Sequence, residues 1–265
     1  MLRNGEFEVV LSWIFSAMEN NTLIDVTPGR PIREGLQRGI YRLIDPLVNF
    51  LVRMGVTPNK ITTFGLMLNG GVAAIFICGA EFGERGDLRY VGWAGALILF
   101  AGLFDMLDGQ VARASGTSSL FGALYDSVID RYSELVMFLG ICYYLISQDY
   151  FLSSLLAFVA LIGSMMVSYV RARAEGLGIE CKGGLMQRPE RVVLTGVSAL
   201  ACGLMAEVIG GSYQVHIDGI PFPVFETISI FTFPIAVMAV LTNITAINRL
   251  RDSRRAIENT GSDRS

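Results

Sequence analysis

Residues 105–130 of this chain are DMLDGQVARASGTSSLFGALYDSVID, and a long apolar run leads directly into them. Two pairs of aspartates lie in this stretch: Asp105 and Asp108 are three residues apart, and Asp126 and Asp130 are four apart. Each pair therefore lies on one face of a helix. A carboxylate inside a membrane helix costs roughly 2.5–3.5 kcal/mol on insertion scales, so such residues are functional by default. Four facing carboxylates would repel one another unless cations lay between them, which predicts a divalent-metal site.

The composition of the 265-residue chain is typical of a membrane protein. Hydrophobic residues make up 52% of it and charged residues 17%, whereas a soluble domain has about 25% charged residues. The net charge of -3 gives no reason to expect a nucleic-acid partner. The four cysteines are scattered and lack metal-ligand spacing. We expect no cleavable signal peptide, because the chain begins with polar and amphipathic sequence that contains acids.

Six apolar segments have close to the ~20 residues that a helix needs to cross a bilayer. They comprise residues 61–80, 91–112, 119–147, 151–172, 190–210 and 222–248. Residues 38–54 precede them and combine arginines with apolar residues at helical spacing, which predicts an amphipathic helix on a membrane surface. The expected fold is an all-α integral membrane protein with six transmembrane helices, preceded by an amphipathic juxtamembrane helix.

The chain divides into three parts. These are a mixed N-terminal segment, 1–37, a membrane domain, 38–250, and a polar cytoplasmic tail, 251–265. We expect the tail to fray from about Asp252. Lysine and arginine gather in the N-terminal segment, the 171–191 loop and the tail, and the loops on the other side carry few. The positive-inside rule then places both termini and the 113–118 turn in the cytoplasm, which predicts a multi-pass protein of the cytoplasmic membrane.

The short turn around Gly116 brings the two aspartate pairs to a similar depth. Asp105 and Asp108 lie 11 and 8 residues before Gly116, and Asp126 and Asp130 lie 10 and 14 residues after it. At 1.5 Å per residue, both pairs lie roughly 12–21 Å from the turn, near the cytoplasmic interface. Oxygen ligands suit Mg²⁺ or Mn²⁺. Two pairs of carboxylates suggest two ions, which would clamp the attacking and leaving oxygens of a phosphoryl-type displacement.

Two alternatives come from other classes of protein. A cation or proton transporter with the acids as its pathway predicts acids on both sides of the midplane or inverted repeats, and neither is evident. A catalytically silent membrane scaffold would lack at least one aspartate, and all four are present. Arg113, one helical turn beyond Gly109, and the glycines themselves fit a phosphate ligand better than an ion pathway.

The spacing of these residues resembles the motif of the CDP-alcohol phosphotransferase family at every fixed position. The motif here is Asp105-x2-Asp108-Gly109-x2-Ala112-Arg113-x8-Gly122-x3-Asp126-x3-Asp130. Members of that family move a substituted phosphoryl group from a CDP-linked donor to an alcohol and release CMP. The resemblance covers about residues 38–250 and implies a homodimer, because members often dimerise. It also implies that Asp130 is the general base on the attacking hydroxyl. Implied metal ligands are Asp105, Asp108, Asp126 and Asp130, and implied nucleotide and donor contacts are Asp108, Gly109, Ala112, Arg113 and Gly122.

A cluster of arginines bears on the acceptor alcohol. Arg171 and Arg173 end the fourth expected span, and Arg191 begins the fifth, where Pro189 fits the first helical turn. Arginine forks match phosphate oxygens, so the cluster suits a phosphorylated acceptor. By charge alone, positive-inside topology and contacts with anionic lipid headgroups explain the cluster equally well.

The sequence around these arginines resembles one branch of the family, which makes phosphatidylinositol phosphate, or its archaeal-lipid counterpart, from inositol 1-phosphate. That resemblance implies that Arg171, Arg173 and Arg191 hold the acceptor phosphate, with Arg249 a weaker candidate. A lysine can stand in that branch at the place of Arg171, and both residues are cationic. His216, the single histidine, falls in a loop far from the acids and has no expected role.

The predicted function is phospholipid synthesis: transfer of a phosphatidyl group from CDP-diacylglycerol (CDP-DAG) to inositol 1-phosphate, with release of CMP, by metal-assisted direct displacement. The same chemistry with glycerol 3-phosphate, inositol or serine as acceptor is the main alternative. The expected partners are a CDP-linked lipid donor, a phosphorylated small alcohol, membrane lipids and a second copy of the chain.

Overall fold

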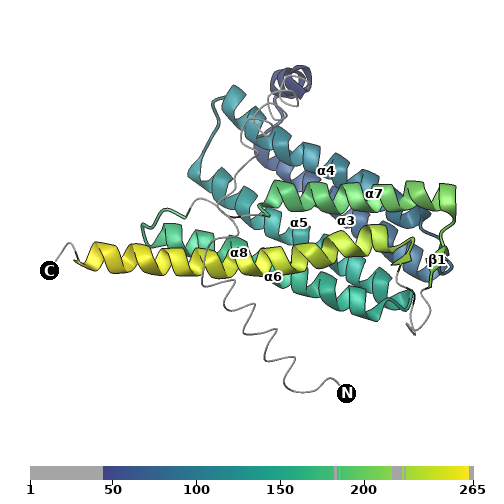
Figure 1. Ribbon diagram of the computed structural model, residues 1–265. Helices are drawn as coiled ribbons and strands as arrows, with labels where there is room; N and C mark the ends of the chain where they lie inside the picture. Colours follow the sequence, from purple (N-terminus) through teal and green to yellow (C-terminus); the bar gives the residue numbers. More distant parts are fainter. Residues whose placement is uncertain (1–43, 182–183, 185, 217–222, 224, 263–265) are drawn as a thin grey trace. The chain divides into compact units, whose positions relative to one another are not determined.

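The computed structural model describes residues 44–181, 184, 186–216, 223 and 225–262 (Figure 1). The chain divides into two units, residues 1–50 and 51–265. Residues 44–53 are helical, in agreement with part of the predicted amphipathic helix. The rest of that helix, residues 38–43, and the segment 1–37 lie outside the described residues. The place of this helix on a membrane surface stays a prediction.

In the described part of the second unit, six long helices account for almost all of the structure. They are α3 (Pro58–Phe82), α4 (Arg89–Ala114), α5 (Leu120–Ser147), α6 (Phe151–Gly176), α7 (Arg188–Ile209) and α8 (Ser229–Ser262). Five of them, all but α5, are long and apolar enough to cross a membrane. Helix α5 has the length, but it carries Asp126, Asp130, Arg131 and Glu134. The helical fold is as predicted, whereas a sixth span stays a prediction.

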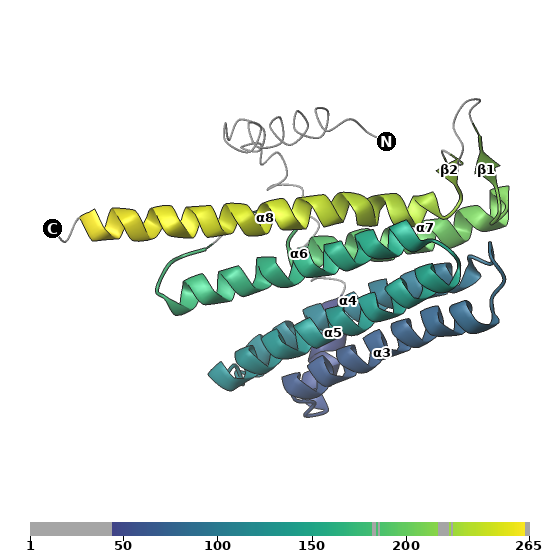
Figure 2. The ribbon, with the colours of Figure 1, turned by 90° about the horizontal axis from the view of Figure 1, so that it is seen from below.

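The six helices run side by side (Figure 2). Helix α3 packs against both α4 and α5, α7 against α4 and α8, and α6 against α5 and α8. The core includes Phe76 of α3 and Phe231 of α8, whose rings stack with centroids 5.9 Å apart. Glycines allow α4 and α7 to approach closely, because a Cβ on Gly92 would lie only 3.0 Å from the Cα of Gly203.

The structure differs from the sequence-based expectations at the last helix. Two short strands, β1 (Gln214–Val215) and β2 (Phe225–Glu226), pair antiparallel before it. Helix α8 therefore starts at Ser229 and not at residue 222. It continues to Ser262, so the expectation that the tail frays from about Asp252 is wrong. An i,i+4 ion pair of 2.7 Å between Arg254 and Glu258 supports the added turns.

Candidate active site

The predicted turn between the aspartate pairs is present. Helix α4 ends at Ala114 and α5 begins at Leu120. Gly116 between them has a φ of +65°, which glycine adopts without strain. Ser119 caps α5, because its Oγ accepts a hydrogen bond of 3.0 Å from the amide of Gly122. This turn returns the chain so that the acids of α5 face those of α4.

Three of the four predicted metal ligands gather at one point. Carboxylate oxygens of Asp105 on α4 and of Asp126 and Asp130 on α5 lie within 4.8 Å of one another. Hard oxygen donors at this spacing suit Mg²⁺ or Mn²⁺ and not a thiolate-seeking metal. The residues present therefore fit a divalent cation.

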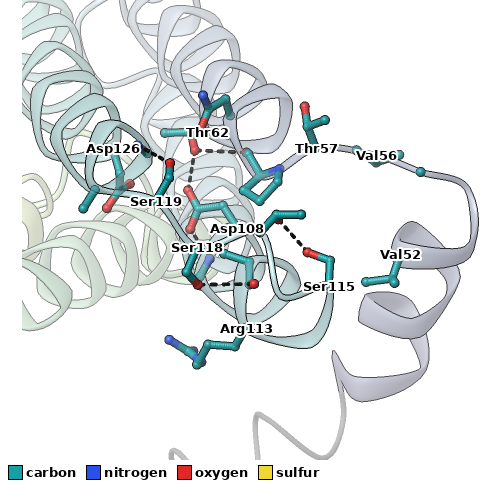
Figure 3. Close-up of a pocket in the computed structure, with 18 residues that line it drawn as sticks. Val52, Val56, Thr57, Thr62, Asp108, Arg113, Ser115, Ser118, Ser119 and Asp126 are labelled. Atoms are coloured by element: carbon teal, nitrogen blue, oxygen red, sulfur yellow. Dashed lines mark hydrogen bonds between the residues drawn. The ribbon is translucent and has the colours of Figure 1, made fainter.

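The fourth aspartate, Asp108, is tied to α3. Its Oδ2 accepts a hydrogen bond of 2.7 Å from the hydroxyl of Thr62, and its Oδ1 accepts one of 2.6 Å from the amide of Gly109 (Figure 3). Its side chain is nearly buried. These bonds orient the carboxylate beside the cluster of three, and Asp108 and Asp126 line the same pocket.

That pocket has a volume of about 500 Å³ and opens beside the aspartates. All five residues that we predicted to contact nucleotide and donor line it, namely Asp108, Gly109, Ala112, Arg113 and Gly122. The start of α3 and the hydroxyl-rich turn of residues 115–119 form further walls (Figure 3). We call it the motif pocket. Its glycine, hydroxyl and arginine lining suits a phosphorylated ligand.

A second pocket, of about 480 Å³, lies on the other side of Asp126. Asp126 and Ala123 line both pockets, so the two adjoin at this point of α5. We call the second one the arginine pocket. Its charged lining residues are Asp126, Asp130, Glu175, Arg131, Arg171, Arg188, Arg191 and Arg249. Three of the four arginines proposed for the acceptor, Arg171, Arg191 and Arg249, are thus brought together.

Arg173 does not line the arginine pocket. The prediction that it binds the acceptor phosphate together with Arg171 is therefore corrected. It lines a separate, largely apolar groove between α6 and α8, together with Leu177, Leu250 and Arg254. The physical reason is helical periodicity, since residues two apart on a helix do not face the same direction.

Arg188 was missed as a site residue. It enters the aspartate cluster from the first turn of α7, where it donates a hydrogen bond to Asp105 and its Nη2 lies 2.8 Å from Oδ1 of Asp130. The helix begins two residues earlier than predicted because Gln187 and Glu190 form a capping box around Pro189. The Gln-x-x-Glu spacing in the sequence could have indicated this earlier start of the helix, and with it the place of Arg188 in the first turn. Arg131, next to Asp130, was also missed.

Together these features define a class of protein. It is a bundle of membrane-length helices in which two pockets suited to phosphate groups meet beside a cluster of acidic residues suited to a metal ion, as expected of a metal-dependent phosphoryl-group transferase. A family model described as CDP-alcohol phosphatidyltransferase matches residues 55–247. The chain belongs to this family. It is a transferase of phospholipid synthesis and a multi-pass membrane protein.

Named relatives and solved structures agree with this assignment. Phosphatidylinositol phosphate synthase of Mycobacteroides abscessus is 34% identical over 163 residues, which cover 61% of this chain and 70% of the relative. A crystal structure of Mycobacterium tuberculosis phosphatidylinositol phosphate synthase with CDP-DAG bound matches with a TM-score of 0.61 and 25% identity, over 80% of this chain and 94% of that one. A structure of the same enzyme with manganese and citrate has a TM-score of 0.59 and 25% identity, over 78% and 87%.

Proposed function

We propose that this protein transfers a phosphatidyl group from CDP-DAG to inositol 1-phosphate and releases CMP. The observation that carries the proposal is the meeting of the two pockets at Asp126, with the aspartate cluster beside it. One pocket is lined by most residues of the family motif, and the other is lined by five arginines. The relatives named as phosphatidylinositol phosphate synthases support the choice of acceptor.

The motif pocket would hold the nucleotide end of the donor. Its volume of about 500 Å³ lies within the range of small-molecule sites. Arg113 would pair with a phosphate of the CDP group, and Gly109 and Gly122 leave room for the ligand. Asp105, Asp108, Asp126 and Asp130 would hold two ions of Mg²⁺ or Mn²⁺, which when bound neutralise the charge of the diphosphate.

The arginine pocket would hold the phosphate of the acceptor. A neutral alcohol does not need five arginines, whereas a phosphate accepts forked hydrogen bonds from several of them. Arg171 and Arg249 enter from α6 and α8, and Arg188 and Arg191 enter from α7. Glycerol 3-phosphate would use the same cations, so it is the strongest competing acceptor.

Asp130 lies where the two halves of the reaction would meet, in the aspartate cluster and in the lining of the arginine pocket. The acceptor hydroxyl oxygen would bond to the phosphorus that carries the diacylglycerol. The bond from that phosphorus to the oxygen of CMP would break, and CMP would leave with the bonding electrons. A carboxylate oxygen of Asp130 would accept the hydroxyl proton.

The remaining parts of the proposal concern topology and assembly. We place both termini and the site on the cytoplasmic side, because arginines and lysines gather there in the sequence. That side is where a soluble phosphorylated alcohol is available. A homodimer is the expected assembly.

The test is CMP release by the purified protein in detergent with CDP-DAG and Mg²⁺ or Mn²⁺. Inositol 1-phosphate, glycerol 3-phosphate, inositol and serine are offered separately. We expect release with inositol 1-phosphate alone. Release with glycerol 3-phosphate would keep the role of the arginine pocket but change the acceptor, and release only with an unphosphorylated alcohol would refute the role of the pocket.

A further inference from the structure

A buried ion pair joins α5 and α7 directly behind the arginine pocket. Nε of Arg191 donates to Oε1 of Glu134 at 2.8 Å, and Nη2 donates to Oε2 at 2.9 Å. Only 2% of the Arg191 side chain and 5% of the Glu134 side chain are exposed. Two parallel hydrogen bonds between buried charged groups give a geometry with little freedom to rotate.

Both partners are held from further directions. The hydroxyl of Ser164 on α6 donates to Oε1 of Glu134. Nη1 of Arg191 donates at 2.9 Å to the carbonyl of Met186, just before α7. Three of the five N–H groups of the guanidinium thus have acceptors in the described chain, which leaves one N–H on each terminal nitrogen for a ligand. Arg191 lines the arginine pocket, so a ligand there can reach it.

A second ion pair between the same two helices lies one helical turn away from Arg191 and Glu134. Arg188 precedes Arg191 by three residues, and Asp130 precedes Glu134 by four. Nη2 of Arg188 lies 2.8 Å from Oδ1 of Asp130. The helices α5 and α7 are therefore linked by two successive ion pairs, an inner buried one and an outer one at the aspartate cluster. The inner pair fixes the position of the first turn of α7 relative to α5, and this position determines whether Arg188 can reach Asp130.

We infer that Glu134 is a positioning residue for acceptor binding. It acts through Arg191: it fixes the guanidinium in the wall of the arginine pocket and holds the first turn of α7 so that Arg188 reaches the aspartates. Glu134 itself does not line either pocket in the described chain. The inference rests on the proposed role of the arginine pocket, and it adds a residue that the family motif does not contain.

The test is Glu134→Gln, which keeps the size of the side chain and removes its charge. We expect the KM for the acceptor to rise roughly ten- to a hundredfold, with the KM for CDP-DAG changed by less than about twofold. Inorganic phosphate serves as an inhibitor that competes with the acceptor, and its inhibition constant should rise by a similar factor. Glu134→Asp keeps the charge, so its acceptor KM and its inhibition by phosphate should both lie between those of the wild type and those of Glu134→Gln.

Gln148 offers a matched control. It is also buried, and its Nε2 joins the far end of α5 to α3 through bonds of 3.3 Å to the carbonyls of Gly79 and Gly83. Gln148→Ala should lower the thermal stability of the protein, as loss of any buried polar contact does. It should leave both KM values within about twofold of the wild type.

The outcomes separate the two proposals. Reduced stability and turnover in Glu134→Gln, with both KM values and phosphate inhibition unchanged, would make Glu134 merely structural and overturn the inference. If Glu134→Gln does not fold, Glu134→Asp is judged by the same ratio of KM values. A wild-type enzyme that phosphate does not inhibit, and that prefers an unphosphorylated alcohol, refutes the proposed acceptor site itself.

Discussion

Nη2 of Arg188 lies 2.8 Å from Oδ1 of Asp130, so the arginine pocket and the aspartate cluster are in direct contact. Arg188 belongs to α7 and Asp130 to α5, and these helices are separated in the sequence by all of α6. In the proposed reaction this contact places an acceptor-binding cation beside the group that accepts the proton. Under this proposal, binding of the acceptor and activation of its hydroxyl would occur at neighbouring atoms.

Asp130→Asn tests the proposed base. The amide cannot accept the hydroxyl proton, so we expect turnover to fall by ~10²–10⁴. Donor binding should persist, because the motif-pocket residues are unchanged. Single-turnover CMP release and CDP-DAG binding would be measured together. Near-normal turnover would show that Asp130 is not the base.

Removal of divalent cations should abolish CMP release, and Mg²⁺ or Mn²⁺ should restore it.

Asp126→Asn removes the negative charge of one of the three carboxylates in the cluster. We expect it to raise the metal concentration for half-maximal activity by about ten- to a hundredfold. Manganese titration followed by thermal unfolding gives a readout that does not depend on turnover. An unchanged titration would exclude Asp126 as a ligand.

Arg171 and Arg173 form a pair of matched variants on one helix. Arg171 lines the arginine pocket, whereas Arg173 lines the groove between α6 and α8. Arg171→Ala should raise the acceptor KM by about tenfold, typical for loss of one charged hydrogen bond. Arg173→Ala should leave it within about twofold. Equal effects would mean that the arginine pocket is not the acceptor site.

Thr62→Val tests the tie between α3 and the motif. The variant keeps the shape of the side chain but removes the hydroxyl that donates to Asp108 at 2.7 Å. A hydrogen bond to a charged group contributes about 1.5–3 kcal/mol, so we expect the KM for CDP-DAG to rise about tenfold or more. Thr62→Ser retains the hydroxyl and should stay close to wild type. The acceptor KM serves as the internal reference.

Much of the candidate site was predictable because its parts are close in the chain. Helical periodicity relates Asp105 to Asp108 and Asp126 to Asp130, and a short turn forces the two helices back on each other. The motif pocket is consequently lined by every nucleotide contact that the motif implies. The long apolar segments likewise predicted the helices, since burial in a bilayer demands both length and apolar composition.

Contacts between distant helices could not be predicted in this way. The pairing of Arg188 with Asp130, the burial of Arg191 against Glu134 and the separation of Arg173 from Arg171 depend on how α6 and α7 rotate about their axes. Local spacing states which residues share a face of one helix, but only packing against neighbouring helices decides where that face points. The identity of the acid motif thus follows from local sequence, whereas the composition of the arginine pocket is a property of the packed bundle.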